Sequence, residues 1–175
     1  YKVIGHINKA LTHILPKADD VYPHIKLYKG ELLALRAFMH FEMVRLFAVS
    51  SGSGDSAAKA KAIPYVTTYG IEVTPYSSLD KVFELIVADL TEAEKYLAAD
   101  EELVTATRNN ASDGFTSCRI THLNLYAVQA LLARAYAHFC LLSLYSDFFD
   151  LDNMSSNPGI PYATDPEKTT YADYS

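Results

Sequence analysis

Apolar side chains recur three or four residues apart at the start of the chain, at Val3, Ile4, Ile7, Leu11, Ile14 and Leu15. This spacing is typical of one face of an α-helix. Pro16 follows, and a proline pushes the residue before it out of the α region. The pattern therefore predicts a first helix that closes at Pro16.

The segment from about Ile25 to Ala48, which follows a turn-like stretch from Pro16 to Pro23, is apolar on nearly all sides. Its large apolar residues are Leu32, Leu33, Leu35, Phe38, Met39, Phe41, Met43, Val44, Leu46 and Phe47. A helix that is apolar all round is buried between neighbours. We therefore expect a long central helix here.

A polar stretch over residues 50–62 leads into Ile63–Gly70, which is rich in tyrosine and β-branched residues and predicts an extended loop. This loop is the first place where the chain could meet a ligand. Ser77–Asp80 then resembles a capping box, and apolar residues follow at alternating spacings of four and three, at Leu79, Phe83, Ile86, Leu90, Ala93 and Leu97. A third helix is predicted.

After a polar connection over residues 100–117, Thr121 is the expected cap of a fourth helix that runs to about Tyr145. Alanines alternate there with larger apolar residues, at Ala127, Ala130, Ala133, Ala135 and Ala137. Small side chains let a neighbouring helix approach closely, as helical-repeat proteins require.

The two long helices share an internal duplication. Arg36-Ala37 and His40-Phe41 match Arg134-Ala135 and His138-Phe139, and Ile63-Pro64-Tyr65 reappears as Ile160-Pro161-Tyr162. We therefore predict an all-α, α-solenoid-like fold of two degenerate tetratricopeptide-type helix pairs with loop insertions. It forms a single helical-repeat domain over 1–175, with one pair and its loop in 1–77 and the second in 78–175.

Charge and hydropathy argue against nucleic-acid binding and against a membrane-spanning helix. A net charge of -6 argues against nucleic acid, which proteins bind through clustered Lys and Arg. No apolar run approaches the roughly 20 residues of a membrane-spanning helix. The opening Tyr1–His6 lacks the features of a signal peptide, and we expect the chain to be a fragment of a longer protein.

Two cysteines, Cys118 and Cys140, are present. If the fourth helix begins near Thr121, they lie up to roughly 33 Å apart along its axis, too far for a disulfide. We expect two free thiols, with Cys140 as a small core residue.

Catalytic and metal-binding patterns are missing from the sequence. His6 and His13 stand two turns apart without a zinc motif, so we expect no metal. An oxygen-rich stretch also lacks the glycine and distal glutamate of a calcium loop; it holds Asp147, Asp150, Asp152 and Asn153. No nucleophile motif or phosphate-binding glycine loop occurs, so we predict no cofactor and no enzyme.

The pairs Arg36/His40 and Arg134/His138 each lie on one helix face because their members are four residues apart. They could bind a carboxylate or hydroxyl of a ligand. The interpretation we favour is structural: each arginine bridges neighbouring helices, and each histidine is a partly buried side chain with its polar atoms satisfied.

Four loop tyrosines are the candidate ligand-binding residues: Tyr65, Tyr69, Tyr76 and Tyr162. Their rings could stack on sugars, with nearby polar groups supplying hydrogen bonds. The alternative is that each Ile-Pro-Tyr motif packs its loop against its helix pair. The duplication favours packing for Tyr65 and Tyr162.

Three motifs occur in order: Lys29–Phe47 (KGELLALRAFMHFEMVRLF), Ile63-Pro64-Tyr65, and Asp80–Leu90 (DKVFELIVADL). Together they resemble the N-terminal tetratricopeptide-like region of SusD/RagB-type outer-membrane proteins. The resemblance covers most of residues 1 to 145.

This resemblance implies a non-enzymatic lipoprotein that binds an oligosaccharide or other nutrient at the cell surface. It implies lipid anchoring in the outer membrane and a partner, a TonB-dependent SusC-like transporter, which the helices face. The helix pairs by themselves also fit an alternative, a helical-repeat scaffold for protein–protein interaction. A third alternative is an enzyme that cleaves carbohydrates. Such an enzyme would need two facing carboxyl groups roughly 5–9.5 Å apart.

Overall fold

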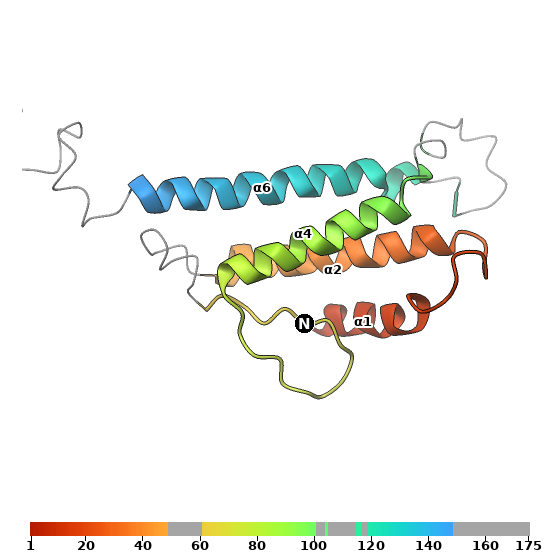
Figure 1. Ribbon diagram of the computed structural model, residues 1–175, viewed down its shortest axis with the longest axis horizontal. Coiled ribbons are helices and arrows are strands. Elements are labelled where there is room, and N and C mark those ends of the chain that lie inside the picture. Colours follow the sequence, from red (N-terminus) through yellow and green to blue (C-terminus); the bar gives the residue numbers. More distant parts are fainter. Residues whose placement is uncertain (49–60, 101–103, 105–114, 117–118, 149–175) are drawn as a thin grey trace, which may run out of the picture.

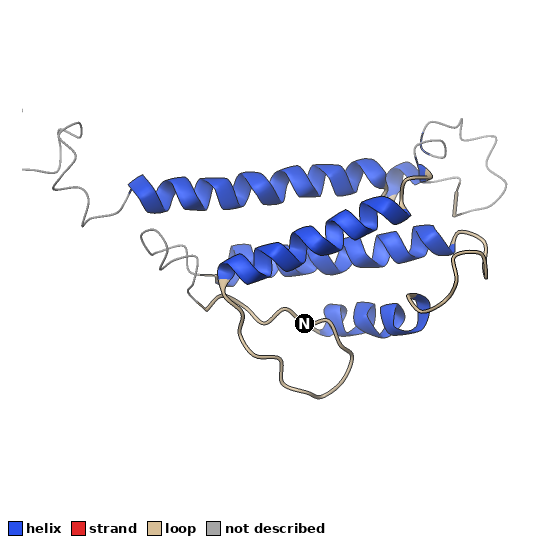
Figure 2. Ribbon diagram, viewed as in Figure 1, coloured by secondary structure: helices blue, strands red, loops and turns tan. Residues whose placement is uncertain are grey.

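The computed structural model describes residues 1–48, 61–100, 104, 115–116 and 119–148, with side chains up to residue 140. Its elements in chain order are α1 (Lys2–Ile14), α2 (Ile25–Phe47), α4 (Leu79–Tyr96), the short 3-10 helix η2 (Arg119–Thr121) and α6 (Leu125–Phe148). The four predicted helices are therefore present, each within a few residues of its expected bounds (Figure 2).

Each α-helix runs antiparallel to the one before it (Figure 1). α1 packs on α2, α2 on α4, and α4 on α6, with the most extensive contact between α2 and α4. This serial packing confirms the all-α, solenoid-like fold class. The division into two duplicated units stays a prediction, because the second Ile-Pro-Tyr loop lies outside the described residues.

The contact between α2 and α4 is close because a glycine lies in it. A Cβ atom at Gly30 would be 2.5 Å from Leu97 Cγ and 3.1 Å from the backbone oxygen of Ala93. Both Ala93 and Leu97 are fully buried. Fully burying a leucine-sized side chain contributes about 1.5–3 kcal/mol, so this tight contact is a main source of stability.

α2 is buried between its neighbours along most of its length, as expected from its apolar pattern. Its C-terminal end differs, because Leu46 and Phe47 are exposed. A helix apolar on all sides needs a neighbour on every side, and no described element covers this end.

The helix starts show one expected cap and one correction. Ser78 Oγ accepts a hydrogen bond of 3.3 Å from the Lys81 amide and caps α4. Thr121 does not cap α6, because it lies in η2. Asn124 takes that role: its Oδ1 accepts a hydrogen bond of 2.9 Å from the Ala127 amide. Asparagine is among the best N-cap residues, so the helix begins there.

Cys140 is a free thiol, as predicted, but it is exposed and does not belong to the core. The described neighbours of α6 lie on one side of it, where Phe83 meets Phe139 with ring centroids 4.0 Å apart. Cys140 lies outside this contact. Cys118 is outside the described residues, as are Asp150, Asp152 and Asn153 of the predicted acidic loop. Asp147, the first residue of that prediction, belongs to α6 instead of a loop.

A buried ion cluster holds the entrance of α6 against the other helices. Arg119 is buried and makes hydrogen bonds of 2.8 and 2.6 Å to the two carboxylate oxygens of Asp100, which follows α4. It also pairs with Glu31 of α2. Burial lowers the pKa of Arg119, but the two carboxylates outweigh it, so the pKa is raised and the charge is kept.

Candidate ligand-binding site

The loop between α2 and α4 is closed at its base over residues 61–78. The Ala62 amide donates to the Ser77 oxygen at 2.8 Å, and the Ser77 amide donates to the Ile63 oxygen at 3.1 Å. These bonds form an isolated antiparallel bridge between Lys61 and Ser78. The loop therefore leaves and rejoins the helices at one place and can present its middle to α1 (Figure 1).

The first half of the loop is held by a buried asparagine of α1. Asn8 Nδ2 donates to the backbone oxygens of Val66 at 2.8 Å and Thr68 at 3.3 Å. Its Oδ1 accepts a 3.4 Å bond from Arg36 Nη1. Asn8 therefore fixes the loop backbone to both α1 and α2.

His40 of α2 supports the same segment. Its Nδ1 donates to the Arg36 backbone oxygen at 2.9 Å, and its Nε2 accepts a 3.0 Å bond from the Val66 amide. These partners assign the neutral tautomer with the proton on Nδ1. Burial lowers the pKa of His40 to about 4, which matches this neutral form.

Arg36, Asp89 and Tyr65 complete the buried network. Arg36 makes a two-pronged ion pair with Asp89 of α4, with both hydrogen bonds 2.7 Å long. The Tyr65 hydroxyl donates to Asp89 Oδ2 at 2.6 Å. Burial first, and then the Asp89 charge, raise the pKa of Tyr65, so the hydroxyl stays protonated. Burial opposes the charge of Arg36, but Asp89 outweighs it and raises the arginine pKa.

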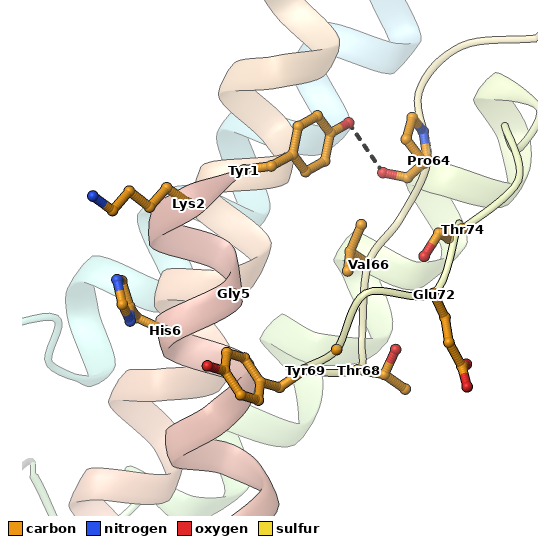
Figure 3. Close-up of a pocket in the computed structure, with 11 residues that line it drawn as sticks. Tyr1, Lys2, Gly5, His6, Pro64, Val66, Thr68, Tyr69, Glu72 and Thr74 are labelled. Atoms are coloured by element: carbon orange, nitrogen blue, oxygen red, sulfur yellow. Dashed lines mark hydrogen bonds between the residues drawn. The ribbon is translucent and has the colours of Figure 1, made fainter.

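A cavity of about 410 Å³ lies between the N-terminal half of α1 and this loop. Its volume falls in the range of roughly 300–1,000 Å³ that small-ligand pockets occupy. The lining residues are Tyr1, Lys2, Gly5, His6, Pro64, Val66, Thr68, Tyr69, Gly70, Glu72 and Thr74 (Figure 3). The Tyr1 hydroxyl closes one end by donating to the Pro64 oxygen at 3.2 Å.

Successive side chains of the loop that forms one wall of the cavity alternate between lining the cavity and facing solvent. Glu72 and Thr74 line the cavity, whereas Ile71 and Val73 do not line it and are almost fully exposed. An extended segment places successive side chains on opposite sides. The loop therefore offers a polar edge to the cavity and an apolar edge to solvent.

The four candidate tyrosines occupy different places. Tyr69 lines the cavity and is 56% exposed, so part of its ring is open to a ligand. Tyr76 is exposed but is not among the lining residues. Tyr65 is 5% exposed and its ring stacks on His40 with centroids 3.9 Å apart, which fits the packing interpretation. Tyr162 lies outside the described residues.

The two Arg/His pairs have different surroundings. Arg36 bridges α2 and α4 and His40 is satisfied, which confirms the structural interpretation of that pair. Arg134 reaches α2, where its Nη2 lies 3.0 Å from Glu42 Oε1 in an ion pair whose angles are poor for a hydrogen bond. His138 packs edge-on against Phe41.

Asn8 and Asp89 are the positioning residues that sequence reasoning missed. Asn8 lies on the buried side of α1 beside Ile7 and Leu11, and this isolated polar residue on an apolar stripe was the available signal. Among the described residues, no group of three or more His, Cys, Asp or Glu could hold a metal ion. No described helix is both long enough and apolar enough to cross a membrane.

The fold and the cavity together define an all-helical repeat protein in which an anchored loop and the first helix enclose a small open site. The chain belongs to the SusD-like family described as starch-binding and associating with the outer membrane, whose model matches residues 1–121. No curated protein matches it.

Two solved structures share its fold. One is a SusD superfamily protein from Bacteroides thetaiotaomicron, with a TM-score of 0.58 and 23% identity. The other is a SusD-like carbohydrate binding protein from Bacteroides vulgatus, with a TM-score of 0.57 and 22% identity. The match covers 91% of this chain in both cases, and 31% and 30% of those chains. The chain therefore spans about a third of their length.

Proposed function

We propose that this chain is part of a carbohydrate-binding protein of the outer membrane and that a sugar binds in the cavity between α1 and the loop over residues 61–78. The observation that carries this proposal is the family match over residues 1–121, which includes every lining residue of the cavity.

The chemistry of the cavity supports sugar binding. The half-exposed ring of Tyr69 offers an apolar face against which a sugar ring can stack. Thr68 and Thr74 lie along the same loop and supply hydroxyl oxygens that can hydrogen-bond to a sugar. A mostly apolar site with a few placed polar groups is the usual composition of a small-ligand pocket.

The same lining favours binding without cleavage. Glycoside hydrolysis uses two facing carboxyl groups roughly 5–9.5 Å apart. Of the residues that line the cavity, Glu72 is the sole carboxylate. We therefore assign the site a binding role and no catalytic step.

The buried network gives this site a rigid wall. Asn8 and His40 fix the backbone of Val66, next to the lining residues Thr68 and Tyr69. A loop held in its binding conformation loses less entropy when the ligand arrives.

Replacement of Tyr69 by alanine tests the site. In the full-length protein, Tyr69→Ala should raise the Kd for a bound oligosaccharide about tenfold, because loss of a stacking ring costs about 0.5–1.5 kcal/mol beyond its buried area. Calorimetry with a panel that begins with maltooligosaccharides measures this change.

Tyr22→Ala is the matched control. Tyr22 is 53% exposed and carries Lys17 4.8 Å from its ring centroid, much as Tyr69 carries Lys9 at 5.3 Å, but it does not line the cavity. Its Kd should stay at the wild-type value. Equal affinities for the two variants would rule out Tyr69 as the stacking ring.

We also propose that the protein is lipid-anchored at the cell surface and acts with a TonB-dependent, SusC-like transporter. The family resemblance of the helical region supports this partnership. Purification of the tagged protein from solubilised outer membranes should recover a TonB-dependent transporter in stoichiometric amount. Recovery of the tagged protein alone, after mild cross-linking, would argue against it.

A further inference from the structure

The exposed face of α1 carries a stripe of basic residues. Lys2, His6, Lys9 and His13 are exposed and follow one another at offsets of four, three and four residues. At 3.6 residues per turn these positions share one side of the helix. α1 contains no Asp or Glu, although the chain as a whole has a net charge of -6.

This basic stripe borders the cavity. Lys2 and His6 belong to its lining, and Lys9 Nζ lies 5.3 Å from the centroid of the Tyr69 ring. In Figure 3 the side chains of Lys2 and His6 leave α1 on the side away from the loop, and the Tyr69 ring lies close to the same helix. The Glu72 carboxylate, the one acidic group of the lining, points away from α1 (Figure 3).

The two lysines of the stripe are not neutralised by the protein. Within the part of the chain that the structure describes, neither Lys2 nor Lys9 forms an ion pair. Lysines elsewhere do: Lys29 pairs with Asp19, Lys81 with Glu84, and Lys95 with Glu92, each at 2.8 or 2.9 Å. The two lysines of α1 therefore lie beside the cavity without an acidic partner among the described residues.

We infer that the cavity takes an anionic glycan, with a sugar ring on Tyr69 and acid groups directed to Lys9 beside that ring and to Lys2 at the rim of the cavity. This inference rests on the proposed carbohydrate function and names the class of sugar. A carboxylate or a sulfate would satisfy the two ammonium groups, and charges of one sign that line a cleft raise the local concentration of an oppositely charged ligand. A neutral glycan would leave both lysines without an anionic partner.

The experiment compares matched oligosaccharides with and without their acid groups. Oligogalacturonate is tested against its fully methyl-esterified form, and a sulfated galactan oligosaccharide against the same oligosaccharide after desulfation. The first pair tests whether the site recognises a carboxylate, and the second pair tests whether it recognises a sulfate. In the full-length protein, at least one acidic form should bind more tightly than its neutral counterpart.

The double variant Lys2→Gln/Lys9→Gln removes the charge of the stripe. Its Kd for the acidic ligand should rise about tenfold at low ionic strength, since each exposed ion pair accounts for a few-fold in affinity. The increase should shrink at high salt, because exposed charges are then screened. Lys81→Gln/Lys95→Gln removes the same charge from α4 and should leave the Kd unchanged.

Three results would overturn the inference. Equal affinity for the acidic and neutral forms, still lost in Tyr69→Ala, would show a neutral-sugar site and leave the proposed function intact. Equal weakening by the α4 control, or equal competition by duplex DNA, would show that net charge alone attracts the ligand. If no oligosaccharide bound in a manner dependent on Tyr69, the proposed function itself would fail.

Discussion

At the scale of single residues, the loop wall depends on buried polar groups that have partners in one protonation state. His40 Nδ1 donates a hydrogen bond to the Arg36 backbone oxygen, and His40 Nε2 accepts a hydrogen bond from the Val66 amide. A second proton on the ring would face that amide and break the bond. The loop wall therefore requires a neutral histidine.

This requirement predicts a pH dependence of stability. The pKa of His40 is lowered to about 4 in the folded protein, against about 6.5 in an unfolded chain. Between these values the unfolded state binds the proton and the folded state does not, so stability falls as the pH falls and levels off below about 4. The loss amounts to about 3 kcal/mol at most.

Urea unfolding at a series of pH values, for wild type and His40→Gln, measures this dependence. The His40→Gln variant should lose the part of the pH dependence of the unfolding free energy that comes from His40. The carboxylates contribute equally to the pH dependence of both proteins. His6→Gln, at an exposed position, should keep the wild-type slope. Parallel curves for wild type and His40→Gln would contradict the assigned neutral histidine.

At the scale of elements, two helical glycines have opposite surroundings. Gly30 faces buried Leu97 and the Ala93 backbone across the contact between α2 and α4. Gly5 of α1 has nothing within 4 Å of an added Cβ. The same substitution should therefore have opposite effects at the two positions.

Gly30→Ala should destabilise the fold by about 1–3 kcal/mol, because overpacking of a close helix contact outweighs the gain in helix propensity. Gly5→Ala should stabilise it by about 0.5–1 kcal/mol, since alanine loses less conformational entropy in a helix. Chemical denaturation of both variants provides the comparison. A stabilising Gly30→Ala would mean that Leu97 can move aside and that the contact is looser than described.

At the scale of the whole molecule, the helices are joined by buried charges as well as by apolar packing. Arg36–Asp89 connects α2 to α4, and Arg119 joins the segment before α6 to Asp100 and Glu31. Such clusters add little net stability when intact, but removal of one partner leaves a buried charge and costs about 3–5 kcal/mol.

Asp100→Ala should accordingly lower the free energy of unfolding by about 3–5 kcal/mol, because Arg119 would keep Glu31 as its one remaining carboxylate partner. The exposed pair Lys81–Glu84 provides the control. Glu84→Ala should change stability by less than about 1 kcal/mol. Similar losses in the two variants would show that the Arg119 cluster is solvated rather than buried.

The arrangement of the helices also explains which surfaces stay open. α1 covers α2 from one side and α4 covers it from another, whereas α6 meets described neighbours on one side only. Cys140 is exposed for this reason. The chain spans about a third of the length of the two SusD-like structures described above.

The sequence by itself determined the helices, their order and the family. Helical spacing of apolar residues is a local signal, and Pro16 and Ser78 mark the end of α1 and the start of α4 through local backbone chemistry. The duplicated arginines were likewise visible in the sequence. Their interpretation as links between helices held for Arg36, which pairs with Asp89 of α4, and for Arg134, which forms an ion pair with Glu42 of α2.

The tertiary structure alone decided what each loop tyrosine does. Tyr65 and Tyr69 are similar in the sequence, yet one packs on His40 and the other lines the cavity. The difference arises from contacts over 25 to 60 residues of separation, such as Asn8 with Val66. Local patterns contain no record of such contacts, so the cavity, and the position of the basic stripe of α1 beside it, emerged only when α1 and the loop were placed together.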